Sequence, residues 1–529
     1  MKNEPKPFTA PCSPALAAIV VLLLFCVTGC KTIALQREMK KVEEISSISP
    51  SKRFIKAHMQ NGQVYVLYHW SFDSAAHTLQ GLGSLLDINR KVVENRGNLS
   101  TSAKNPGIKP FIIPLSAVSL VETNDPGPSL AGGLGIVTGI AGAFAIYCAA
   151  NPKACFGSCP TFYASDGDTL HLQAEGFSAS IAPSLERNDI DMLYWAHYTP
   201  DFEVLVTNEA LETHSIRYAN LLAVEKTPGE RVFADPGGIF YRCSALVPPR
   251  DCRSASGDCS DLVRNADGKE YYSLADARNL DTKEEIFLTF TAGGAGRQGL
   301  VIGKRQTLLT TFLMYQGLAY MGRGAAFWIA ERERGAVKNR TTLFDLLGSI
   351  EVLRKNAAGA WVSEGTVGET GPIATDFNII PLSAEAGETV ELKLRLNKGL
   401  WRLDYLALAT IGATATPTLI PPHAVDVVKG SERAPLDKLL NPAAFLVTYP
   451  GDAYRLHYRL PFGDAELFLD SRGYYLEWMR TDWLGEQNLL KLNTFVNKPA
   501  RYLKKAAPAY KKLEPSMEKT FWQSRYATH

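Results

Sequence analysis

Short runs that alternate apolar and polar residues recur along most of the chain, which predicts β-strands rather than helices. The clearest early pair, 54–59 and 64–68, is separated by a turn that contains Asn61-Gly62. Asn-Gly between two β-prone runs is the strongest short-range signal for a hairpin, because both turn residues must accept a positive φ. The pattern therefore predicts an antiparallel hairpin near the start of the folded body.

Two later runs, 111–115 and 118–121, read as closing strands, so residues 52–123 are expected to form a small β domain. Their layout resembles small Sm-like or SH3-like barrels, in which a nucleating hairpin returns through a strand of the type Pro-Leu-Ser-x-Val. The resemblance implies a barrel-like fold and carries no function. The polar and charged segment 30–51 before it is expected to be a tether.

The first thirty residues have a different pattern. A weakly basic start that contains Lys2 and Lys6 precedes an apolar run over 15–27 and an exit of small residues. This order describes a secretory signal rather than a spanning helix. The exit, Val27-Thr28-Gly29-Cys30, resembles the lipobox of bacterial lipoproteins.

The lipobox resemblance implies that residues 1–29 are a signal peptide and that the thiol of Cys30 carries a lipid. The partner it implies is a lipid bilayer, with the body outside the cytoplasm. In such lipoproteins, an Asp directly after the lipid-modified Cys is the signal for retention in the inner membrane. This chain has Lys31 at that position. The resemblance therefore implies the outer membrane, at its periplasmic or surface face. The alternative is an ordinary signal or an N-terminal anchor with an incidental Cys.

Residues 129–150 contain no charged residue and are rich in Gly and Ala. Ala131, Gly135, Gly139 and Ala143 recur every four residues, which on a helix forms a stripe that lets another helix approach closely. The length permits a membrane span, but one crossing would place the later cysteines on the wrong side of an inner membrane. We expect a closely packed helix within the fold, with membrane insertion as the alternative.

The rest of the body is expected to be mainly β. Residues 152–340 combine alternating strands with a helix candidate at 306–335, whose apolar positions fit a period near 3.6 and whose glycines predict a break near the middle. Residues 341–411 alternate strongly and predict a β-sandwich, a pattern similar to jelly-roll carbohydrate-binding modules. The Pro-rich segment 412–436 is expected to be a linker, and 437–529 adds strands and a basic C-terminal segment.

Composition agrees with a folded, exported protein of several domains. The chain has 529 residues, 46% hydrophobic and 21% charged, with a net charge of +2 that argues against an extended nucleic-acid surface. The fold class expected is mainly β with some α (α+β), with a small barrel-like N-terminal domain, a Gly/Ala-rich helix and β-sandwich domains. The basic C-terminal segment is expected to be a solvated helix face or, alternatively, a contact with anionic lipid or lipopolysaccharide.

The cysteines also fit an oxidising compartment. After the signal and Cys30 are set aside, an even number remains, which suggests disulfides of open connectivity. The cysteines fall in two clusters, 148–159 and 243–259. Zinc is disfavoured because no Cys-x-x-Cys pair occurs and no His lies within either cluster. The candidate disulfide residues are Cys148, Cys155, Cys159, Cys243, Cys252 and Cys259.

No catalytic motif stands out, and no metal or cofactor is expected. Trp361, Trp401 and Tyr405 are candidate aromatics for stacking on a sugar, although aromatics in a sandwich are usually core. A glycosidase needs two carboxylates roughly 5–10 Å apart, and the closest group in sequence is Glu175, Glu186, Asp189 and Asp191. The function expected is a non-enzymatic envelope module that binds a protein or a glycan or takes part in assembly. The alternative is an envelope glycan hydrolase that uses a carboxylate pair.

Overall fold

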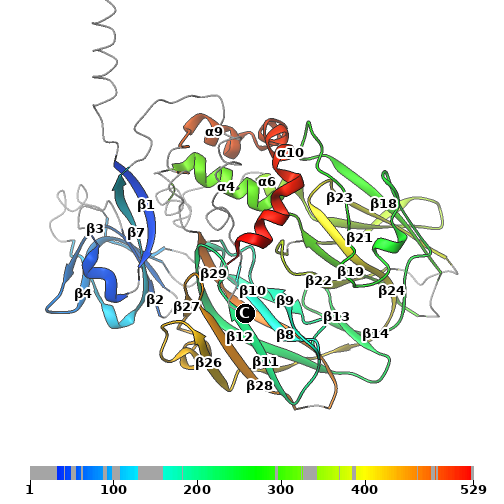
Figure 1. Cartoon of the computed structure of the whole chain (residues 1–529), viewed down its shortest axis with the longest axis horizontal. Helices are drawn as coiled ribbons and strands as arrows, with labels where there is room; N and C mark the ends of the chain where they lie inside the picture. Colours follow the sequence, from blue (N-terminus) through cyan, green and yellow to red (C-terminus); the bar gives the residue numbers. More distant parts are fainter. Residues whose placement is uncertain are drawn as a thin grey trace, which may run out of the picture.

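The computed structural model describes residues 33–128 and 159–525, apart from short gaps (Figure 1). The gaps are 41, 49–54, 61–62, 87–91, 98–107, 182, 292–295, 323–324, 326–341, 369, 384–388, 462, 478–482 and 484–485. The signal peptide, Cys30 and the Gly/Ala-rich segment 129–150 lie outside the described residues.

The N-terminal part is a seven-stranded antiparallel sheet. Its strands in spatial order are β1 (Ile33–Lys40), β7 (Val118–Pro128), β2 (Ile55–Met59), β3 (Val64–Asp73), β4 (Thr78–Leu86) and β5 (Val92–Asn95), with β6 (Phe111–Pro114) paired to β4. The predicted hairpin is confirmed: Ile55 lies opposite Leu67, and the backbone N–H of Met59 donates to the carbonyl of Gln63 at 2.9 Å.

The segment 30–51 is not simply a tether. Its residues Ile33–Lys40 form β1, which runs antiparallel to β7, and Val42–Ser47 form the short helix η1. In the sequence, Ile33, Leu35 and Met39 are even numbers of residues apart, a spacing that is compatible with a strand. Ile45 and Ile48, within and just after η1, are buried in the core of this sheet.

The rest of the described chain forms four stacked β-sheets, which we number as layers 1 to 4. Layer 1 contains β26 (Ala424–Lys429), β28 (Ala453–Arg459), β11 (Asp201–Thr207), β8 (Thr161–Ser165) and β9 (Leu170–Glu175). Layer 2 contains β10 (Arg187–Met192), β29 (Ala465–Glu477), β12 (Glu212–Glu225), β25 (Thr418–Ile420) and β27 (Leu446–Thr448). These two layers enclose one hydrophobic core.

The other two layers are built from the chain between β12 and β25. Layer 3 contains β14 (Phe240–Val247), β13 (Arg231–Ala234), β22 (Asp376–Pro381), β19 (Gln298–Gln306), β24 (Trp401–Ala415) and β17 (Tyr271–Tyr272). Layer 4 contains β16 (Gly257–Asp258), β15 (Asp251–Ser254), β18 (Lys283–Thr291), β23 (Thr389–Asn397), β20 (Ile350–Lys355) and β21 (Trp361–Val367). One core joins layers 2 and 3, and a larger one joins layers 3 and 4.

Layer 3 is therefore covered on both faces, which explains the composition of its central strands. Every residue of β19 from Gln298 to Arg305 is buried, as expected of a strand without a solvent face. At Gly303 an added Cβ would lie 2.6 Å from the ring of Phe377, so only glycine fits there. The neighbouring layers can approach closely because this position has no side chain.

This topology differs from the linear division that the sequence suggested. Residues 231–415 form a two-layer unit inserted between strands of layer 2, so neither 152–340 nor 341–411 is self-contained. The segment 412–436 is not a linker, because it contains the end of β24, β25, β26 and the start of α7 (Pro435–Leu440). Its prolines lie outside the strands, where the missing N–H costs no ladder hydrogen bond. The expected class, a multidomain, mainly β protein with β-sandwich architecture, is confirmed.

Helices cover one end of layers 3 and 4 (Figure 1). They are α4 (Leu309–Met321), α6 (Leu343–Leu347), α9 (Leu489–Asn497) and α10 (Pro499–Ser524). The predicted break in the helix candidate is confirmed at Gly322, whose φ of 49° and lack of space beside Gln487 require glycine. Short helical turns occur at η2 (Leu115–Ala117), η4 (Pro183–Leu185) and η5 (Ser260–Leu262).

The N-terminal sheet contacts layer 2 through a small buried cluster. Leu120 of β7 packs with Phe445, Tyr474 and Leu476. The Nδ1 atom of His58 on β2 lies 2.7 Å from the hydroxyl of Tyr474 on β29. The two parts of the chain are thus joined by apolar packing and by a buried hydrogen bond.

Candidate ligand-binding groove

Three helices enclose a groove of about 320 Å³. This volume is at the lower end of what small-molecule sites offer. The groove is lined by Phe312, Gln316 and Tyr320 of α4, by Leu490, Lys491 and Thr494 of α9, and by Tyr502, Lys505, Ala506, Ala509 and Leu513 of α10.

The wall of the groove is largely apolar, and its polar groups are few. Small residues on α10, Ala506 and Ala509, leave the space that larger side chains would fill. The hydroxyl of Tyr320 donates to Oε1 of Gln316 at 2.8 Å, and the hydroxyl of Tyr502 lies 3.5 Å from that of Tyr320. Burial raises the pKa of both phenols, so they remain neutral hydrogen-bonding groups at neutral pH.

The charged groups of the groove are all basic. Lys505 is exposed at its rim, and Nζ of Lys491 lies 5.3 Å from the ring centroid of Tyr320, in a cation–π arrangement. Within the described part of the chain, no acidic side chain contributes to the lining. An anion that entered the groove would meet no like charge from these residues.

Apolar side chains are exposed at the mouth of the groove. Leu489 and Leu490 begin α9 and are 63% and 82% exposed. The preceding Asn488 caps this helix by accepting from the N–H of Lys491 at 2.9 Å, which stabilises the first turn, where the two leucines lie. A pair of exposed leucines beside an apolar groove extends the surface available to a ligand.

The α10 wall is held firmly against layer 3. Glu518 on α10 pairs with Arg305 of β19 at 2.6 Å and with Arg402 of β24. Glu270 accepts from both arginines, so the four side chains form one ion-pair network. Although burial opposes ionisation, Arg305 and Arg402 hold the pKa of Glu518 below its ordinary value. This network ties the C-terminal part of α10, just beyond the residues that line the groove, to layer 3.

The sequence did not identify this groove as a site. Its α10 wall lies in the basic C-terminal segment, for which a contact with anionic lipid was only the alternative expectation. Pro508 and Pro515 lie within α10, and such prolines normally argue against a helix. The helix changes direction along its length (Figure 1), which is how prolines are accommodated.

Three of the four candidate carboxylates, Glu175, Asp189 and Asp191, lie near one another, since Asp189 and Glu175 both raise the pKa of Asp191. Glu175 ends β9 and accepts from the N–H of Ile373 at 2.8 Å. Glu186 is paired with Arg217 and Arg472. Asp189 and Asp191 lie on β10, where layer 2 faces layer 3. A glycan would have no access to Glu175, Glu186 or Asp191, whose side chains are enclosed by protein.

Burial changes the acidity of these groups. It raises the pKa of Glu175 to about 7. Burial and the neighbouring Asp376 raise the pKa of Asp189 to about 6. Burial and, next in size, the charge of Asp189 raise the pKa of Asp191 well above its ordinary value. Lys304 of β19 compensates part of this charge through an ion pair with Asp376 at 2.6 Å. Sequence reasoning missed Lys304 and Asp376, because nothing local indicates that their strands meet β10.

The three candidate aromatics do not form one platform. Trp401 and Tyr405 both lie on β24, but a β-bulge at the step from Leu403 to Tyr405 reverses the facing of the strand. Trp401 therefore packs between layers 3 and 4, while Tyr405 packs between layers 2 and 3. Trp361 lies on β21 in layer 4, beside Phe287 and Lys393. Trp401 and Tyr405 therefore belong to two different cores, and Trp361 lies on the edge strand of another sheet.

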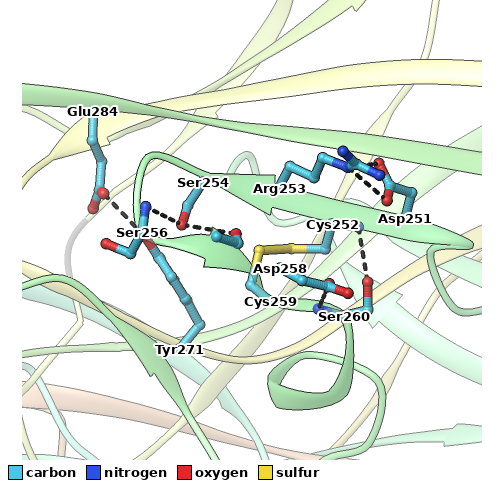
Figure 2. Close-up of a disulfide and its surroundings, with 11 residues drawn as sticks. Asp251, Cys252, Arg253, Ser254, Ser256, Asp258, Cys259, Ser260, Tyr271 and Glu284 are labelled. Carbon is cyan, nitrogen blue, oxygen red and sulfur yellow. Dashed lines mark hydrogen bonds and ion pairs between the residues drawn. A yellow bond between two sulfur atoms is a disulfide. The ribbon is translucent and has the colours of Figure 1, made fainter.

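One of the expected disulfides is present in the described residues, between Cys252 and Cys259. Figure 2 shows how it joins β15 to the residue after β16, with Ser260 accepting from the N–H of Cys252 at 3.0 Å. Cys159 and Cys243 are buried free thiols, which corrects the expectation that they are bridged. Burial raises the pKa of Cys243 to about 12, which favours the protonated thiol at neutral pH. Cys148 and Cys155 lie outside the described residues.

Replacing both Cys252 and Cys259 with alanine should lower the free energy of unfolding by about 2–3 kcal/mol, because the disulfide closes a short loop. The measurement is chemical denaturation of the double variant against the native chain. Ser256→Ala in the same hairpin is the control and should change the free energy by less than about 0.5 kcal/mol. A double variant as stable as this control would contradict the expectation.

Comparison with known proteins adds no family. No protein-family model matches the chain, and no curated protein matches it. Within the described residues, no three His, Cys, Asp or Glu side chains are grouped so as to hold a metal ion. None of the helices in the described part of the chain is both long enough and apolar enough to cross a membrane. The fold and the groove therefore define a class only: a layered β protein with a groove between three of its helices.

Proposed function

We propose that this protein is a membrane-anchored envelope lipoprotein that acts as a non-enzymatic binding or assembly module, with the α4–α9–α10 groove as its binding site. The single observation that carries this proposal is the groove itself. It is largely apolar and open, Leu490 is exposed at its mouth, and none of the described residues that line it is acidic.

The geometry of the acidic residues supports the same choice over the hydrolase alternative. A glycosidase requires two carboxylates on either side of a bound sugar. Glu175 has the raised pKa of a general acid, but its side chain is enclosed between layer 1 and the segment before β22. A raised pKa caused by burial alone is a property of many structural carboxyls.

Filling the groove should abolish binding without unfolding the protein. Ala509→Trp places a large side chain in the groove from α10, whereas Ala500→Trp makes the same change at an exposed site on that helix. The test isolates tagged full-length protein from its native envelope in gentle detergent and identifies retained proteins, lipids and glycans. A component should be retained by the native chain and by Ala500→Trp but lost with Ala509→Trp.

Two results would contradict the proposed function. The first is an identical set of retained components for the native chain and both variants. The second is glycan hydrolysis by the purified protein that disappears with Glu175→Gln while the fold is intact.

The membrane anchor is tested separately. We expect mature protein from cells to begin at Cys30 and to carry a lipid-sized mass increment on that residue, as the lipobox implies. Cys30→Ser should remove the increment, because the thiol that would carry the lipid is then absent. Intact mass measurement of the N-terminal peptide decides the question, and an unmodified Cys30 would refute the lipoprotein assignment.

A further inference from the structure

The chemistry of the groove indicates what kind of molecule it accepts. Protein partners bury surfaces on the order of 1,200–2,000 Å² in stable complexes, whereas a groove of about 320 Å³ is on the scale of a small molecule. Its walls come from Phe312, Leu490, Ala506 and Leu513, which offer apolar contact along three helices. A flexible hydrocarbon chain is suited to such a lining.

The polar groups of the groove add a second requirement. Lys491 and Lys505 bring positive charge to the lining, and neither forms an ion pair with a described residue. The hydroxyl groups of Tyr320, Tyr502 and Thr494 donate within the protein, to Gln316, to Tyr320 and to the carbonyl of Leu490, so the two ammonium groups are the charged donors of the lining. Two ammonium groups suit a carboxylate or phosphate rather than a neutral head group.

The position of the groove supplies a source for such a molecule. Strand β1 begins at Ile33, shortly after Cys30 in the sequence, and in Figure 1 its start lies toward the same upper edge as α9 and α10. The exposed leucines Leu489 and Leu490 belong to α9. A lipid on Cys30 would therefore hold this edge of the molecule close to the bilayer.

We propose that the α4–α9–α10 groove binds the acyl chain of an anionic, single-chain amphiphile from the membrane, with its head group at Lys491 and Lys505. This inference rests on the proposed function and names the ligand class of the same site. The acyl chain lies between α4 and α10 and covers Leu490 at the mouth. The exposed leucine pair guides the chain from the bilayer into the groove.

The experiment uses full-length protein in a non-ionic detergent and a long-chain fatty acid that carries a photoactivatable group in its chain. The corresponding fatty alcohol, with the same photoactivatable group, is the neutral probe. After illumination, mass spectrometry identifies the labelled peptides. We expect the acid to label peptides of α4, α9 and α10, and to label them about tenfold more than the alcohol, which corresponds to one head-group interaction.

Matched variants separate the acyl site from the head-group site. Ala509→Trp should reduce labelling of the groove by about tenfold or more, whereas Ala500→Trp should leave it unchanged. Lys505→Glu should remove the preference for acid over alcohol. Lys504→Glu, an exposed neighbour outside the lining, should retain that preference. Thermal unfolding of each variant establishes that it is folded.

The outcomes distinguish this inference from the proposed function. Labelling outside the groove, or equal labelling of the native chain and Ala509→Trp, would overturn the acyl site. Equal labelling by acid and alcohol would overturn the anionic head group. If a groove-dependent component is retained from the envelope while the fatty acid does not label the groove, the binding module stands and the ligand class is refuted. If no retained envelope component depends on the groove, the proposed function itself is refuted.

Discussion

Replacing Glu186 with alanine should lower the free energy of unfolding by about 3–5 kcal/mol, the largest single effect we expect. Glu186 is 1% exposed and pairs with Arg217, which is 3% exposed, and with Nε of Arg472 at 3.0 Å. Nη2 of Arg217 also donates to Oε2 of Glu186 at 2.9 Å. Removal of the carboxylate leaves positive charge buried without its main counter-ion, which is far more costly than loss of a surface pair.

The appropriate control is an exposed ion pair in the same molecule. Glu391 pairs with Lys355 at 3.0 Å, with side chains 47% and 37% exposed. Glu391→Ala should therefore change the free energy by about 1 kcal/mol or less, because solvent screens such pairs. Both variants are compared by chemical denaturation at one pH. Equal midpoints for Glu186→Ala and Glu391→Ala would show that the buried pair contributes no more than the surface one.

A second large effect is expected in the pH dependence of stability. Glu175 is 2% exposed, and burial raises its pKa from 4.5 to about 7 in the folded chain. Between these values the folded state holds a proton that the unfolded state has lost. The stability from this group is complete below about pH 4 and is lost as the pH rises through 7, by about 3 kcal/mol in total. Asp189 and Asp191 act in the same direction.

Glu175→Gln isolates this effect because glutamine keeps an acceptor for the N–H of Ile373 but does not ionise. The free energy of unfolding of the native chain should fall by several kcal/mol between pH 4 and pH 9, and the variant should lose about 3 kcal/mol less over the same range. Glu391→Gln at an exposed position should follow the native curve. Parallel curves for the native chain and Glu175→Gln would mean that Glu175 ionises in the folded state as it does in water.

Local alternation was sufficient to predict many of the strands, though not β1, β25 and β26, and it did not predict which strands are neighbours. The run that became β23 (Thr389–Asn397) was evident from its pattern, as was the hairpin around Asn61-Gly62. Layer membership depends on pairings such as Glu212 with Glu477 in β12 and β29, and no short-range signal specifies such a pairing. The sequence therefore predicted correctly that the protein is mainly β with sandwich architecture, but it placed the boundaries between domains incorrectly.

The candidate sites show the same limit at the scale of single residues. Trp401 and Tyr405 are four residues apart, a spacing that places both on one face of a regular strand. The bulge at Asp404 reverses this facing, and it depends on pairing with β19. The groove gathers residues from three helices that are distant in sequence. Only the folded arrangement brings Phe312, Thr494 and Ala509 together.

The insertion of layers 3 and 4 into layer 2 has a consequence for the order in which the chain can fold. Strand β12 is synthesised early, but its long antiparallel partner β29 follows the entire inserted unit. Until β29 arrives, β12 has an unpaired edge and apolar residues such as Leu221 that are buried in the finished protein. A chain that terminates before residue 465 would therefore be an aggregation-prone fragment, even with its inserted unit complete.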